Sequence, residues 1–309
     1  MLPFLLRRIL WGVLTLLLTA CFAFGIVRLL RPELYGGQSM ITGTWTDVGQ
    51  ALLHLNVGGD PSYQEEWQDG MWADLFLLAG GVLVAVGLGV SAGLWCAVRR
   101  RRPSARAIES SAMFFLCAPP YVLALGTLLL FAPPFGLVQL PFFFDPHSYA
   151  PPLDDPWDFF RSMLVPCVLV GLPLAASMMR LTLALTADAM GEEWVRTAQA
   201  KGLPHERVVR RHAAPAAFPT VASLFGVSAP ILVLNIVLVE YVFSVPGFFR
   251  HMRKALGQNE GLADKFTDIP MLQAIALWAA VLIVALSLLG DLAIMRLDPR
   301  VRAAGKTVG

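Results

Sequence analysis

Long apolar runs alternate with short polar connections along most of this chain. A helix needs about 20 apolar residues to cross a bilayer, and six runs approach or exceed that length. They cover residues 9–30, 75–98, 107–132, 163–188, 218–243 and 270–295. The pattern predicts an all-α membrane protein with six transmembrane helices, in a single membrane domain that takes in residues 1–309. The first run has no small-residue cleavage site, so we expect a retained span and not a signal peptide.

Proline and glycine interrupt several of these runs. Each proline removes a backbone donor, so we expect breaks or kinks at the following positions. They are Pro119-Pro120, Pro166, Pro173 and Pro230. Such breaks suit either a moving core with a water-lined cavity or ordinary kinks in a packed bundle. Both interpretations stay open at the level of sequence.

Composition and the placement of basic residues indicate the orientation. The chain is 56% hydrophobic and 15% charged, which excludes an ordinary soluble domain. Most arginines lie before the first run, in the second and fourth connections and after the last run, whereas residues 133–160 contain no lysine or arginine. The positive-inside rule therefore predicts a multi-pass protein with both termini in the cytoplasm and an external loop at 31–74. The run Arg99 to Arg102 fits cytoplasmic anchoring better than nucleic-acid binding.

The fourth connection, residues 189–217, is the longest polar segment with the features of helices. Glu193 lies where a helix N-terminus favours negative charge, and Lys201 and Gly202 resemble a C-cap. Leu203-Pro204 then starts a second helical run that is rich in arginine. The pattern predicts two short helices joined at a glycine, which is typical of a docking element.

Motifs for catalysis are weak. Residues 89–93 read GVSAG, but a serine nucleophile needs a strand-to-helix turn, and here the pattern lies inside an apolar run. Close helix packing through the glycines is the favoured interpretation, and an intramembrane hydrolase is the alternative. The sequence has no phosphate-binding loop and no complete zinc motif. We therefore expect no enzyme activity, no cofactor and no metal in this chain, and we expect another chain to bind any nucleotide.

Three blocks of sequence resemble a known family. Residues 195–203 read VRTAQAKGL and are followed by RHA at 211–213, residues 239–247 read VEYVFSVPG, and residues 297–302 read LDPRVR. The blocks are similar to the cytoplasmic loop and its flanking motifs in permease subunits of ABC importers, in the dipeptide, oligopeptide and nickel branch. Arg196 stands where the general loop motif has glutamate, as in this branch, and Gln199 replaces the arginine that is usual there.

The resemblance implies a type I importer fold in the prokaryotic inner membrane, with a cytoplasmic coupling helix. It implies a second permease subunit, two ATPase subunits or domains that bind ATP and Mg²⁺, and an external solute-binding protein, all held at the lipid bilayer without nucleic acid. The residues expected to carry coupling are Glu193, Trp194, Arg196, Thr197, Ala198, Lys201, Gly202 and Leu203. Those expected at an external gate or docking surface are Glu240, Pro246 and Gly247. Glu240 is also a carboxylate inside an apolar run, a position where charge is costly.

The cargo stays open. Import of dipeptides or oligopeptides is the main prediction, and import of a nickel chelate or another small solute is the alternative. A scaffold that only recruits an ATPase is a third possibility.

Overall fold

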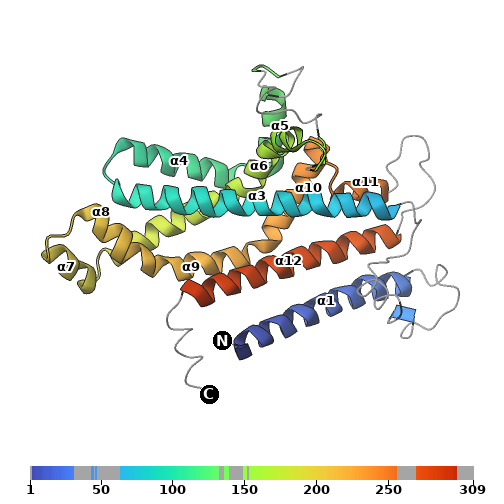
Figure 1. Ribbon diagram of the computed structural model, residues 1–309, viewed down its shortest axis with the longest axis horizontal. Helices are drawn as coiled ribbons and strands as arrows, with labels where there is room; N and C mark the ends of the chain where they lie inside the picture. The colour runs from blue at the N-terminus through green and yellow to red at the C-terminus, as the bar shows by residue number, and fades with distance from the viewer. Residues whose placement is uncertain are drawn as a thin grey trace. The chain divides into compact units, whose positions relative to one another are not determined.

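A computed structural model describes residues 2–30, 43–44, 46, 63–131, 136–138, 149–151, 153–255 and 269–297. The long helices are α1 (Leu2–Leu30), α3 (Tyr63–Val98), α6 (Pro156–Ala189) and α12 (Ile269–Leu297). Shorter ones are α4 (Pro103–Cys117), α5 (Pro120–Phe131), α7 (Glu193–Ala200), α8 (His205–Val208), α9 (Ala214–Val227), α10 (Ala229–Phe243) and α11 (His251–Ala255) (Figure 1). Most of the predicted external loop and the residues after Leu297 lie outside the described ranges.

Within the described ranges, four helices are long and apolar enough to cross a membrane. Two bent pairs of helices raise the number to six if each pair makes one span. The first pair is α4 and α5, which are bent by 107°. The second pair is the run from α8 through α9 together with α10, bent by 53°. The prediction of an all-α membrane protein is confirmed. The first bend lies at Pro119-Pro120, where the sequence predicts one, and the second lies at Ser228, just before Pro230.

A break at Pro166 or Pro173, one of the two expected outcomes, is wrong, because α6 runs through both prolines. Neighbouring helices can support a helix where a proline has removed a donor. Here the buried Asn235 of α10 donates its side-chain amide to the carbonyl of Val170, at 3.3 Å, close to Pro173 in α6. This cross-helix hydrogen bond joins α6 to α10 one residue from Leu169, whose carbonyl Pro173 leaves without its helical donor.

The chain divides into two compact units. Unit 1 comprises residues 1–73 and 246–288, and unit 2 comprises residues 74–245 and 289–309. In unit 1, Ala20, Phe24 and Leu277 form a buried cluster, and the Gln273 side chain donates to the Ala23 carbonyl at 3.3 Å. These contacts join α1 to α12.

Unit 2 is built around α6. Gly89 and Gly93 of α3 face α6 so closely that a Cβ atom on either would lie 2.7 Å from a backbone oxygen of that helix. The GVSAG pattern thus serves close packing, as its favoured interpretation predicts. In the same stretch of α6, Ala176 and Met179 pack against Cys96 of α3 and against Ala105 and Ala112 of α4. Small side chains let the helices approach, and dispersion and hydrogen bonding then hold them together in lipid.

Asp155 caps α6 at its N-terminus. Its carboxylate accepts hydrogen bonds from the backbone N–H groups of Trp157 and Asp158, at 2.9 and 3.1 Å. We expect Asp155→Ala to lower the free energy of unfolding by about 1 kcal/mol, because those N–H groups then lose their partner. Thermal unfolding of the purified chain measures this loss. Asp154→Ala is the matched control and should leave the unfolding temperature unchanged.

Candidate functional site

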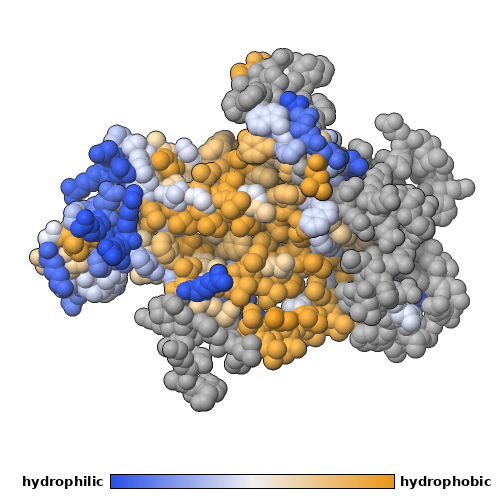
Figure 2. Space-filling model, in the orientation of Figure 1, coloured by the Kyte–Doolittle hydropathy of each residue, from blue (hydrophilic) through white to orange (hydrophobic). Residues whose placement is uncertain are grey.

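The predicted docking element lies at one end of unit 2. α6 ends at Ala189, the chain turns, and α7 and α8 follow beside the turn that joins α3 to α4 (Figure 1). Figure 2 shows polar residues gathered at this end and apolar side chains over much of the visible helical surface beyond it. The element therefore projects from the part of unit 2 that is suited to water.

One face of α7 packs on its own chain. Val195 and Ala198, three residues apart, are buried, with 0% and 6% of their surface exposed, and α7 contacts α8 and the π-helical turn Val209–Ala213. Positions i and i+3 share a helix face, so this spacing marks the buried side. Ala198 therefore fits tightly within the subunit, and its small size alone is not evidence of contact with another chain.

The rest of the α7 surface, and the residues that follow the helix, are open. The exposed residues among the predicted coupling set are Glu193, Trp194, Arg196, Thr197, Lys201 and Gly202, and Leu203 is half-buried. Trp194 has 46% of its surface exposed. An exposed tryptophan surrounded by charged and polar side chains is typical of a contact residue in a protein interface. The structure brings these residues together on one short segment, and their role in coupling stays a prediction.

Gly202 ends α7 with a φ of +77°, a conformation that favours glycine. Its N–H donates to the Gln199 carbonyl at 2.9 Å, and no atom lies within 4 Å of the position a Cβ would take. The need for glycine therefore comes from the backbone and not from crowding. The predicted helix–glycine–helix arrangement is confirmed.

We expect Gly202→Val to destabilise the folded conformation of the α7–α8 junction by about 1–2 kcal/mol, because a β-branched residue disfavours a left-handed backbone. Gly202→Asn should cost less, since asparagine adopts that conformation more readily. Hydrogen exchange of the 193–208 backbone amides in the purified chain measures the difference. Equal exchange in the two variants would show that φ does not govern the junction.

The second predicted short helix differs from expectation. α8 does not end before the next span, because it continues through the π-helical turn directly into α9. The wider turn ends two residues before Pro215, which lacks the N–H that an α-helix would use there. Residues His205 to Val227 therefore form one continuous helical run that starts after Gly202.

The three residues predicted for an external gate belong to different units. Glu240 is fully buried in α10 of unit 2, and Ser244 ends that helix with a φ of 53°. Pro246 and Gly247 belong to unit 1, where the Gly247–Phe248 backbone lies against Gly70 of α3. Gly70 was missed in the sequence because nothing local marks a contact between segments so far apart. The roles of all three predicted residues stay predictions.

Comparison with known proteins identifies the family. Residues 89–303 match the family described as binding-protein-dependent transport system inner membrane component, so the match covers more than half of the chain. The chain belongs to this family. It is an ABC importer permease of the inner membrane, and it crosses that membrane several times. The resemblance inferred from the three sequence blocks is thereby confirmed.

Several proteins with similar sequences are named as permeases of peptide transport systems. The chain is 28% identical over 228 residues to a Brucella abortus protein named as a peptide transport system permease, with 74% of this chain and 68% of that protein covered. It is 29% identical to the oligopeptide transport system permease protein OppB of Mycobacterium bovis, with 74% and 70% covered. It is 32% identical over 145 residues to the dipeptide transport system permease protein DppB of Escherichia coli, with 47% and 40% covered.

Proposed function

We propose that this permease imports dipeptides or oligopeptides and that α7 couples it to ATP hydrolysis on a partner. The observation that carries the coupling proposal is the two-sided character of α7. Val195 and Ala198 fix one face of the helix to the subunit, while the exposed side chains of Trp194, Arg196 and Lys201 are available to a second protein. The names of the relatives support a peptide cargo.

The proposed assembly contains a second permease subunit, two cytoplasmic ATPase subunits or domains and an external solute-binding protein. ATP and Mg²⁺ bind to the ATPases. The end of unit 2 that holds α7 and Arg99 to Arg102 faces the cytoplasm in this proposal, with both chain termini on the same side. Basic residues are retained preferentially on that side, which supports the orientation.

The mechanism follows from the connection of α7 to the membrane helices. ATP binding closes the two ATPases and displaces α7 as a rigid body, because its buried face is packed on α8 and on the π-helical turn. The displacement reaches α9 through the continuous helical path. A rigid-body shift of this kind can change which side of the membrane the transport path faces.

The proposed function is tested in proteoliposomes that contain the whole transporter, purified through this chain, together with its solute-binding protein. We expect an ATP-binding subunit to copurify, and peptide addition to stimulate both ATP hydrolysis and peptide uptake. Stimulation by nickel chelates and not by peptides would change the cargo. Copurification without stimulation by any solute would favour a scaffold and contradict the importer proposal.

A further inference from the structure

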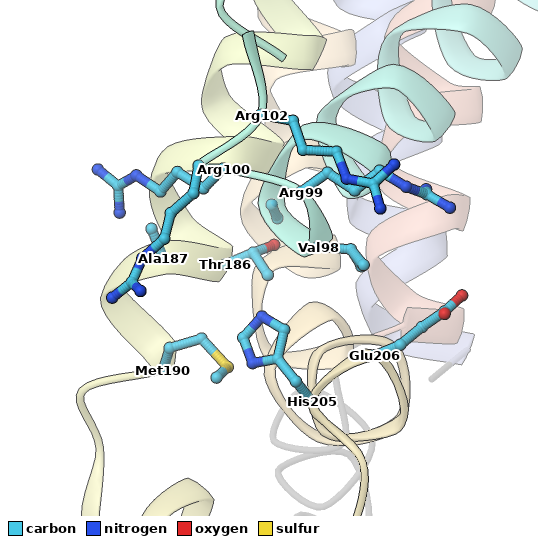
Figure 3. Close-up of a pocket in the computed structure, with 11 residues that line it drawn as sticks. Val98, Arg99, Arg100, Arg102, Thr186, Ala187, Met190, His205 and Glu206 are labelled. Atoms are coloured by element: carbon cyan, nitrogen blue, oxygen red, sulfur yellow. The ribbon is translucent and has the colours of Figure 1, made fainter. Parts of the chain in front are cut away.

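A large basic cavity opens at the same end of unit 2. Its volume is about 770 Å³, within the range of ligand sites in proteins. The lining comes from three segments: the turn after α3, the last turn of α6 and the start of α8. Figure 3 shows the arginine turn on one side of the space, His205 and Glu206 on the other, and Thr186 between them.

Arginine dominates the charge of this lining. Arg99, Arg100, Arg101 and Arg102 all line the cavity, against a single carboxylate, Glu206. That carboxylate is engaged by Arg210, which lies outside the lining, at 3.0 Å. Positive charge therefore dominates the lining, which favours an anionic ligand.

The arginine turn has a defined shape. The Arg102 N–H donates to the Arg99 carbonyl at 2.8 Å, and Pro103 follows as the first residue of α4. The Arg99 guanidinium lies 5.0 Å from the centre of the Trp95 ring, where a cation–π interaction holds it. Part of the entropy cost of ordering the Arg99 side chain is thus already met before a ligand binds.

Thr186 provides a buried polar group in the wall of the cavity. Its side chain is 0% exposed, and its hydroxyl has no hydrogen-bond partner within the described part of the chain. A buried hydroxyl without a partner costs about 1–3 kcal/mol. A ligand oxygen that accepts from Thr186 would remove that cost, which distinguishes the cavity from a solvated patch of surface charge.

We propose that this cavity binds the phosphate group of an anionic ligand. Arginine binds phosphate through paired N–H donors, and the Thr186 hydroxyl donates to a further phosphate oxygen. The volume accommodates more than a bare phosphate, so both an anionic lipid headgroup and a soluble phosphate compound fit. Bound there, the phosphate links the arginine turn and α6 to α8, the start of the helical path that follows α7. The site does not depend on which solute is transported.

The experiment uses the full chain purified in detergent. Binding of phosphatidylglycerol and of phosphatidylcholine is measured by native mass spectrometry, and binding of inorganic phosphate by isothermal titration calorimetry. We expect a phosphate-bearing anionic ligand to bind, and Arg100→Ala combined with Arg102→Ala to weaken it about tenfold or more. Thr186→Val keeps the side-chain shape, removes the hydroxyl, and should weaken the same ligand severalfold.

Arg106→Ala is the matched control, because it removes an exposed positive charge from α4 that is not part of the lining. Selective binding of phosphatidylglycerol supports the proposal with lipid as the source, and binding of inorganic phosphate alone supports it with a soluble source. Equal binding of the two lipids together with no phosphate binding overturns it. The proposal is also overturned if Arg106→Ala weakens binding as much as the double arginine variant does, or if Thr186→Val binds the ligand as tightly as the original chain. Either result would show diffuse attraction to surface charge.

Discussion

Replacing Trp194 with alanine is expected to abolish most peptide uptake and peptide-stimulated ATP hydrolysis while leaving the permease folded in the membrane. Trp194 is 46% exposed and lies in α7 at the edge of the face that Val195 and Ala198 bury. Tryptophan at the centre of an interface commonly contributes about 2 kcal/mol or more to binding, which corresponds to roughly thirtyfold weaker association. Copurification of the ATPase with the permease, and the two activities in proteoliposomes, measure the effect.

Trp157→Ala is the matched control for this experiment. Trp157 is exposed to nearly the same extent, at 45%, but lies in the first turn of α6, at the other end of that helix from α7. Its ring stacks on Phe160 at a centroid distance of 6.0 Å, a contact within α6. ATPase copurification should be unchanged in this variant. If Trp194→Ala retains normal copurification and uptake, α7 does not dock through its exposed face.

Hydrophobic patterning could predict the spans because burial in lipid requires apolar residues over a fixed length. It could not locate where helices begin in water. α3 starts at Tyr63, well before the apolar run at 75, so the end of segment 31–74 is helical. α6 likewise begins at Pro156, ahead of the run at 163, because the Asp155 cap starts the helix before the apolar residues do. Local capping and solvation determine where α3 and α6 begin, and a hydropathy pattern contains no information about either.

The docking segment was predicted well where its signals are local. The acids at the start of α7 and the glycine after it act on the backbone next to them, and the structure places the ends of the helix at these residues. The burial of Val195 and Ala198 and the cavity beside Arg99 depend on chain segments distant in sequence. A spacing of three residues could have suggested that Val195 and Ala198 share a buried face. Nothing local could have shown that the arginine turn lies beside Thr186 and His205.

Glycine-to-alanine substitutions at different positions of α3 are expected to change the free energy of unfolding in opposite directions. A Cβ on Gly89 would lie 2.7 Å from the Ala175 carbonyl oxygen and 2.9 Å from the Met178 Cβ, so α3 and α6 must separate. Gly89→Ala should therefore lower the free energy of unfolding by about 1–3 kcal/mol. Gly87→Ala, two residues away, meets nothing within 4 Å and should raise stability by up to about 1 kcal/mol through its helix propensity.

Gly171→Ala extends the same argument to the other helix and should have the largest effect, because its Cβ would overlap the backbone oxygen of Gly81. The backbone fixes the position of a Cβ atom, and its neighbour is a main-chain oxygen, so no rotamer change relieves the overlap and either α3 or α6 must shift. Denaturant unfolding of the detergent-purified chain measures all three variants. Equal stability of Gly87→Ala, Gly89→Ala and Gly171→Ala would contradict close packing of α3 on α6. A loss confined to Gly89 and Gly171 would identify that packing as a main support of unit 2.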